Sequence, residues 1–139
     1  MLFPKKVKFR KSHTFREHPD KVGVATRGNK VSFGSFGLKA ITAGRLTANE
    51  IESGRKTIAH SMSKTGKLWT RIFPDKPYTQ KPAEVKMGKG KGDVQGYEVA
   101  IKPGRVLYEV DGVEEVQARE MLRKGGTKLS VRTKIIARS

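Results

Sequence analysis

Apolar and polar residues alternate along several short stretches of the chain, which is the pattern of half-buried β-strands. Residues 67–73 are the clearest case, because Leu68 and Ile72 fall on one face and Trp69 and Arg71 on the other. The prolines that follow this stretch are predicted to stop the strand. Further strands are predicted at residues 31–40, 97–101, 106–110 and 129–135.

A capping box marks the start of a first helix. The Thr47 hydroxyl can accept the N–H of Glu50 while the Glu50 carboxylate reaches back to the N–H of Thr47. Apolar and small residues then recur at helical spacing and predict the buried face. These residues are Ile51, Gly54, Ile58 and Met62. Gly66 is predicted to stand just beyond the end of this helix.

A second helix is predicted from Val113 to about Lys124, with Ala118, Met121 and Leu122 facing inward. The glycine pair that follows is predicted to end it, because glycine is unfavourable inside a helix. The order of strands, helix, strands, helix and strand predicts an α+β fold with a mixed or antiparallel sheet and two helices.

The length of 139 residues fits one compact domain with an extended arm. We assign residues 1–21 to a basic N-terminal arm and residues 22–139 to a single α+β domain that carries a loop at 86–96. The hydrophobic share of 35% supports only a modest core.

Charge is the strongest compositional signal. Thirty Lys and Arg against thirteen Asp and Glu give a net charge of +17, which calls for a polyanionic partner. Nucleic acid, an anionic membrane surface and an acidic protein are the candidates. No apolar run approaches the roughly 20 residues of a spanning helix, and the start has no apolar signal region. The absence of cysteine excludes disulfides and thiolate sites. We expect a cytoplasmic protein that acts on nucleic acid.

The basic arm combines cations with aromatic residues. Its Lys and Arg side chains can neutralise phosphates, and its phenylalanines can stack on unpaired bases. The alternative is a disordered, solubilising tail. The candidate RNA-binding residues of the arm are Lys5, Lys6, Lys8, Arg10 and Lys11.

The first helix has a polar face opposite its apolar one. Lys56, His60 and Lys64 lie there, and no acid follows the first turn until Asp75. This face either is simply solvated or contacts RNA. Acidic residues instead gather around the second helix, whose N-terminus favours negative charge, and this part is expected to face away from a polyanion or toward a basic neighbour. They are Glu109, Asp111, Glu114, Glu115 and Glu120.

Residues 87–92 read Met-Gly-Lys-Gly-Lys-Gly and match no nucleotide-binding loop. The Walker pattern requires Gly-Lys-Ser/Thr at its end, and the dinucleotide pattern requires a third glycine where Asp93 stands. The segment is therefore either a flexible hairpin or a finger inserted among phosphates. The histidines lack metal-ligand spacing and no nucleophile motif occurs, so we expect neither an enzyme nor a metal or other cofactor.

Several segments occur in the order and spacing of one known family. They are residues 1–6, 8–11, 31–40, 44–48, 66–77, 87–92 and 103–112. In these segments the chain resembles the universal family of large-subunit ribosomal proteins that includes the bacterial protein numbered sixteen and the archaeal and eukaryotic "ten-e" proteins.

The resemblance implies a hammerhead-like fold and a structural role in the ribosome. Family members bind 23S-type rRNA near the base of the central protuberance, in the neighbourhood of 5S rRNA and of other ribosomal proteins. They lie beside the aminoacyl-tRNA site, help organise the tRNA-binding region and contact tRNA. No homo-oligomer or membrane association is implied. A cytoplasmic ribosome is expected, and an organelle-encoded copy stays open.

Position by position, the resemblance extends to particular residues. The rRNA-binding set comprises Lys5, Lys6, Lys8, Arg10, Lys11, Arg55, Lys56, His60, Lys64 and Arg71. The loop expected near tRNA and the peptidyl-transferase centre comprises Lys86, Met87, Gly88, Lys89, Gly90, Lys91 and Gly92. This chain departs from the family pattern at Lys86, where many bacterial members have an arginine that can be hydroxylated. The glycine pair at 125–126 replaces helix formers and predicts a shortened second helix.

Overall fold

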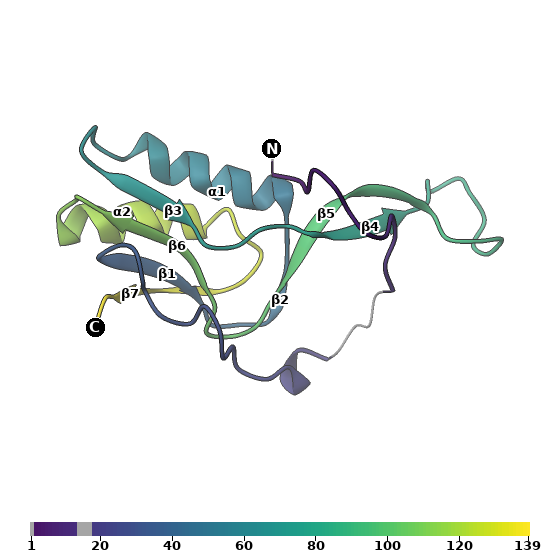
Figure 1. Ribbon diagram of the computed structural model, residues 1–139, viewed down its shortest axis with the longest axis horizontal. Coiled ribbons are helices and arrows are strands. Elements are labelled where there is room, and N and C mark those ends of the chain that lie inside the picture. The colour runs from purple at the N-terminus through teal and green to yellow at the C-terminus, as the bar shows by residue number, and fades with distance from the viewer. Residues whose placement is uncertain (1, 14–17) are drawn as a thin grey trace.

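The computed structural model describes residues 2–13 and 18–139. Its elements in chain order are η1 (Pro19–Lys21), β1 (Phe36–Ala40), β2 (Gly44–Thr47), α1 (Ala48–His60), β3 (Lys67–Thr70), β4 (Lys76–Gln80), β5 (Asp93–Ile101), β6 (Val106–Asp111), α2 (Glu115–Gly126) and β7 (Thr133–Ala137). This set of helices and strands confirms the predicted α+β fold with two α-helices (Figure 1).

The strands form two antiparallel sheets. One has the order β3-β6-β1-β7, and the other has the order β2-β5-β4. Tyr108 of β6 and Leu38 of β1 are register partners, and they contact α1 and α2 respectively. Both helices therefore cover the same face of the four-stranded sheet. The β4–β5 hairpin extends away from this body and carries its connecting loop to the far end of the molecule (Figure 1).

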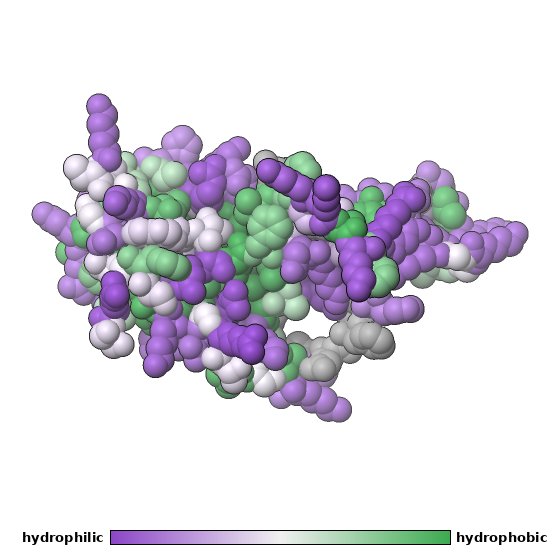
Figure 2. Space-filling model, in the orientation of Figure 1, coloured by the Kyte–Doolittle hydropathy of each residue, from purple (hydrophilic) through white to green (hydrophobic). Residues whose placement is uncertain are grey.

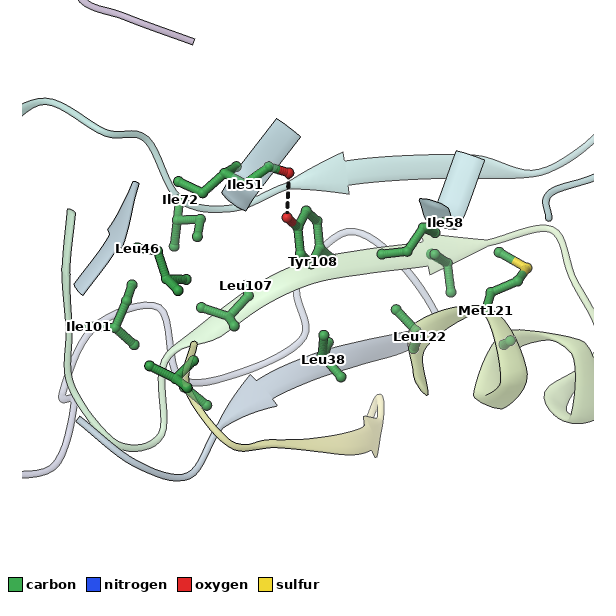
Figure 3. Packing of buried hydrophobic residues seen from close by; sticks show 14 residues of the cluster. Leu38, Leu46, Ile51, Ile58, Ile72, Ile101, Leu107, Tyr108, Met121 and Leu122 are labelled. Carbon is green, nitrogen blue, oxygen red and sulfur yellow. Dashed lines mark hydrogen bonds between the residues drawn. The ribbon is translucent and has the colours of Figure 1, made fainter. Parts of the chain in front are cut away.

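The core lies between the two helices and the four-stranded sheet. Ile58 of α1 lies beside Met121 and Leu122 of α2, whereas Ile51 of α1 lies over Tyr108 of the sheet (Figure 3). Full burial of each such aliphatic side chain contributes about 1.5–3 kcal/mol. The buried Tyr108 donates its hydroxyl to the Ile51 carbonyl at 2.6 Å, and desolvation raises its pKa. This bond leaves no unsatisfied hydroxyl beneath α1.

Helix α1 begins at the predicted cap. The Thr47 hydroxyl accepts the N–H of Glu50 at 3.3 Å. The predicted second half of the capping box is wrong, because the Glu50 carboxylate accepts from Ser130 instead, at 2.9 Å from its hydroxyl and 3.3 Å from its N–H. Glu50 thus joins the start of α1 to the segment before β7, an interaction over 80 residues that local sequence could not reveal.

The end of α1 was predicted too late. The helix stops at His60, with Ser61 as its C-cap, and Gly66 lies in a separate turn whose N–H donates to the carbonyl of Ser63 at 3.1 Å. The hydroxyls of Ser63 and Thr65 lie 3.1 Å apart. Short hydroxyl side chains of this kind favour turns over helix interiors, which explains the early stop.

Helix α2 continues through both glycines, so the prediction that they end and shorten it is wrong. A Cβ at Gly125 would lie 2.6 Å from the Cδ1 atom of Ile58. The missing side chain lets α2 pack tightly on α1, and this contact compensates for the poor helix propensity of glycine. The helix begins at Glu115 rather than Val113, and Glu114 makes no side-chain capping bond.

Several strand boundaries differ from the prediction. Strands β2 and β4 were not anticipated, and β5 begins at Asp93 rather than Tyr97. Strand β4 was not predicted because its sequence contains proline, which cannot donate an N–H to a sheet. Pro77 is tolerated because β4 is an edge strand, which need not donate every N–H. Strands β1, β3 and β7 span 36–40, 67–70 and 133–137 instead of 31–40, 67–73 and 129–135.

Candidate nucleic-acid interface

The described part of the basic arm lies in an extended conformation along the molecule. Residues 2–13 contain neither helix nor strand, and Leu2 anchors them by packing against the core. Lys5, Lys6, Lys8 and Arg10 are exposed. Their charges therefore face outward. The remainder of the arm includes residues 1 and 14–17, which lie outside the described residues.

The arm meets the glycine-lysine loop, although 80 residues separate them in sequence. The Lys11 ammonium donates to the carbonyl of Lys91 at 3.4 Å. The Lys91 ammonium in turn donates to the carbonyl of Ser12. These contacts bring two predicted RNA-binding segments to the same end of the molecule. Hydrophilic side chains cover most of this end (Figure 2).

The loop itself has an unusual backbone. Gly88, Lys89 and Gly90 have φ values of 101°, 58° and 106°. Glycine adopts such angles readily, whereas a side chain opposes them. A Cβ at either glycine would meet nothing within 4 Å, so backbone conformation rather than internal packing requires glycine there. The Lys81 ammonium donates to the Gly88 carbonyl, and the loop borders an open hollow of about 610 Å³. Met87 is 93% exposed at its tip.

The polar face of α1 carries both compensated and uncompensated charge. Arg55 forms two hydrogen bonds to Glu52, at 3.1 and 2.5 Å, and this contact lowers the pKa of the Glu52 carboxyl. Lys56 and His60 are exposed on the helix. Lys64 is also exposed, but it follows the helix end and does not lie on the helical face that was predicted for it.

Arg71 points into the fold. Its NH1 atom lies 2.7 Å from Oε2 of Glu109, whose side chain is fully buried. Glu109 also accepts the N–H groups of Ser32 and Phe33, at 2.6 and 3.1 Å. Burial raises the pKa of Glu109, but the bonds from Arg71 and the two N–H groups outweigh it, so the pKa falls below its ordinary value. The prediction that Glu109 belongs to an acidic cluster around the second helix is therefore wrong, because its carboxylate is buried against Arg71, Ser32 and Phe33.

The other predicted acidic residues have surface positions. Glu114, Glu115 and Glu120 are exposed on or beside α2, where Glu115 and Glu120 pair with Arg119 and Arg123. The carboxylates of α2 are thus balanced by basic residues of the same helix, whereas positive charge gathers at the end formed by the arm and the loop. Among residues 2–13 and 18–139, no group of three or more His, Cys, Asp or Glu could hold a metal ion. Within the same residues, no helix is long and apolar enough to cross a membrane.

Known proteins of similar sequence identify the family of this chain. The family described as ribosomal protein L16p/L10e matches residues 4–136. The large ribosomal subunit protein uL16 of Francisella tularensis subsp. novicida (strain U112) is 53% identical over 136 residues, which are 98% of this chain and 96% of the relative. The proteins of the same name from subsp. tularensis (strain WY96-3418) and subsp. mediasiatica (strain FSC147) show the same identity and coverage. The chain therefore belongs to the L16p/L10e family of ribosomal proteins, as its motifs indicated.

Proposed function

We propose that this protein is a structural constituent of the large ribosomal subunit that binds large-subunit rRNA mainly with its basic arm and the polar face of α1, and that presents its loop to the tRNA-binding region. The family is structural and non-enzymatic, and the relatives are named as large-subunit proteins. The observation that carries the proposal is the joining of two uncompensated basic segments, the arm and the loop, through Lys11, Ser12 and Lys91. A polyanion is the partner that removes their mutual repulsion.

The arm and the polar face of α1 supply most of the proposed rRNA contact. The exposed lysines Lys5, Lys6 and Lys8 lie on an extended backbone, which suits a track of phosphates. Lys56 and His60 add charge on α1, and Lys64 adds it just beyond the helix. Arg55 and Arg71 stay in the predicted set, although each has an internal carboxylate partner.

The loop is the proposed contact with the tRNA-binding region. Its three successive residues with positive φ turn the chain sharply, and residues 86–91 are exposed. By the family resemblance, this loop would lie beside the aminoacyl-tRNA site, and the body would lie near the central protuberance, 5S rRNA and neighbouring ribosomal proteins. We include these finer placements in the proposal, together with a ribosome in the cytoplasm.

Sedimentation and binding tests separate this function from generic RNA binding. Tagged full-length protein should sediment with the large subunit at one copy per particle and stay there in high salt. Purified protein should also bind large-subunit rRNA more tightly than an unrelated RNA of equal length. Equal affinity for both RNAs, with loss from the particle in high salt, would establish the generic module instead.

The loop is tested separately in assembled ribosomes. Lys89→Ala combined with Lys91→Ala removes two charges, and Gly90→Val opposes the observed backbone angle. Both variants should assemble into the large subunit, because the arm and α1 supply most of the rRNA binding. Ribosomes that contain them should nevertheless bind tRNA at the aminoacyl site and form peptide bonds more slowly. Lys128→Ala, an exposed lysine beyond α2, is the matched control and should have no effect. Normal kinetics of the loop variants at full occupancy would reduce the loop to a flexible hairpin.

A further inference from the structure

Phe33 and Trp69 form a stacked aromatic pair, which we name the aromatic shelf. Their ring centroids lie 6.1 Å apart with an interplanar angle of 23°. Phe33 is 54% exposed, and Trp69 is half-buried. Trp69 is the register partner of Glu109, whereas the adjacent Tyr108 points toward α1. Because neighbouring strand residues face opposite sides, the shelf lies on the sheet face away from the helices.

A buried carboxylate fixes the position of the shelf. Glu109 accepts the N–H of Phe33 and that of Ser32, so it holds the backbone on which the Phe33 ring is mounted. The same carboxylate binds Arg71, whose guanidinium carbon lies 4.9 Å from the centroid of the Phe33 ring. One anion thus orients both the ring and its cation. A ring held in place before binding loses little conformational freedom when it meets a ligand.

The charge near the shelf is positive. Lys67 precedes Trp69 by two residues on β3, so its ammonium emerges on the same face. Strand β3 is an edge strand, which leaves one side of the shelf uncovered by the sheet. Lys67 and Arg138 lie close enough to act on the carboxylate of Asp111. Asp111 also accepts a serine hydroxyl at 2.6 Å, and Glu109 is buried, so both acids are already engaged within the fold.

We propose that the aromatic shelf is a stacking site for one unpaired base of large-subunit rRNA. The inference rests on the proposed rRNA binding and adds to it a contact on the other side of the fold from α1. Unpaired RNA bases stack on aromatic side chains, and cations beside the ring engage the phosphates that flank the base. The nearby positive charge favours an RNA segment over an uncharged apolar partner, because only the RNA supplies phosphates for cations such as Lys67 and Arg138.

The chain offers a direct probe, because Trp69 is its single tryptophan. Purified large-subunit rRNA is titrated into full-length protein at a fixed, moderately high salt concentration, and Trp69 emission and affinity are measured. Stacking of a base should quench the emission. Phe33→Leu keeps an apolar side chain but removes the ring, and it should weaken binding on the order of tenfold. Phe33→Tyr keeps the ring and should bind like the wild type. Val116→Ala, at an 81% exposed site on α2, is the control for loss of an exposed apolar side chain.

The outcomes separate this inference from the proposed function. If rRNA binds specifically, but emission stays constant and Phe33→Leu binds as tightly as Phe33→Tyr, the stacking site is refuted and rRNA binding stands. If Phe33→Leu binds rRNA normally yet is lost from reconstituted particles, a protein covers the shelf and the inference is likewise refuted. If the wild type does not prefer rRNA over an unrelated RNA, the proposed function itself fails. Equal thermal melts of the two Phe33 variants establish that a difference in binding does not reflect unfolding.

Discussion

The buried pair of Glu109 and Arg71 gives the sharpest stability prediction. In Glu109→Gln, the amide oxygen can still accept the N–H groups of Ser32 and Phe33, so the main loss is the negative charge opposite Arg71. Removing one partner of a buried pair costs about 3–5 kcal/mol, because the other charge is left uncompensated. The Arg71 side chain is 20% exposed and can reach some water. We therefore expect Glu109→Gln to lower the free energy of unfolding by about 3 kcal/mol, near the lower end of that range.

The assay is denaturant unfolding of the full-length chain, followed through Trp69. The matched control is Glu120→Gln, which breaks a pair with Arg123 whose side chains are 52% and 59% exposed. Such surface pairs contribute little, so the control should unfold almost like the wild type. If Glu109→Gln unfolds at the same denaturant concentration as the control, loss of the Glu109 charge does not leave Arg71 as a buried, uncompensated cation, and the reasoning is refuted.

The pH dependence supplies an independent check on the same pair. The pKa of Glu109 is lower in the folded protein than its ordinary value. The stability that the ionised carboxylate contributes is therefore fully present above the ordinary pKa, and it is lost as pH falls through the lower folded-state pKa. The difference between the wild type and Glu109→Gln should shrink over that acidic range. A difference that stays constant down to the lowest pH at which the wild type folds would contradict the linkage.

Other substitutions test the packing and the basic surface. Ile58→Asp places a charge in the core and should destabilise the free protein by several kcal/mol in thermal melts. Lys56→Ala with Lys64→Ala should leave the melt unchanged but weaken rRNA binding and flatten its salt dependence; a larger loss of stability than Ile58→Asp would overturn the face assignment. Gly125→Val should cost about 2 kcal/mol because its side chain meets Ile58, whereas Gly23→Val, in open space, should change the unfolding free energy by less than about 0.5 kcal/mol. Trypsin should cut the basic arm quickly in free protein and slowly in the subunit, and equal rates would count against arm binding.

Local signals in the sequence predicted what local physics decides. The Thr47 cap was found because a hydroxyl three residues before an N–H is a short-range geometry. The predicted buried faces of both helices were confirmed at Ile51, Ile58, Met121 and Leu122, because helical periodicity alone determines which positions share a face.

The predictions that failed concern positions where contacts between distant segments of the chain decide the structure. Gly125 stays helical because Ile58, 67 residues earlier, occupies the space of a side chain. Pro77 stays in a strand because its strand lies at a sheet edge, a position that only the complete topology defines. The partner of Arg71 lies 38 residues away in the sequence. The alternation of apolar and polar residues could assign Arg71 to one face of a strand, but it could not show that a buried carboxylate lies on that face. No local sequence pattern predicts these three long-range contacts.

These same distant contacts explain how a chain with a charge of +17 keeps a defined shape before it meets RNA. Two part-buried arginines are paired with carboxylates inside the fold: Arg71 pairs with Glu109, and Arg45 pairs with Glu98 at 2.9 Å. Both carboxylates are largely or fully buried, so solvent and salt screen these pairs less than they screen surface charge. The lysines of the arm and the loop have no such internal compensation in the described structure beyond backbone carbonyls. Rising salt should therefore weaken the affinity for free large-subunit rRNA outside the assembled particle, while the free energy of unfolding stays nearly unchanged. A parallel loss of both with rising salt would show that the two sets of charges are not separate.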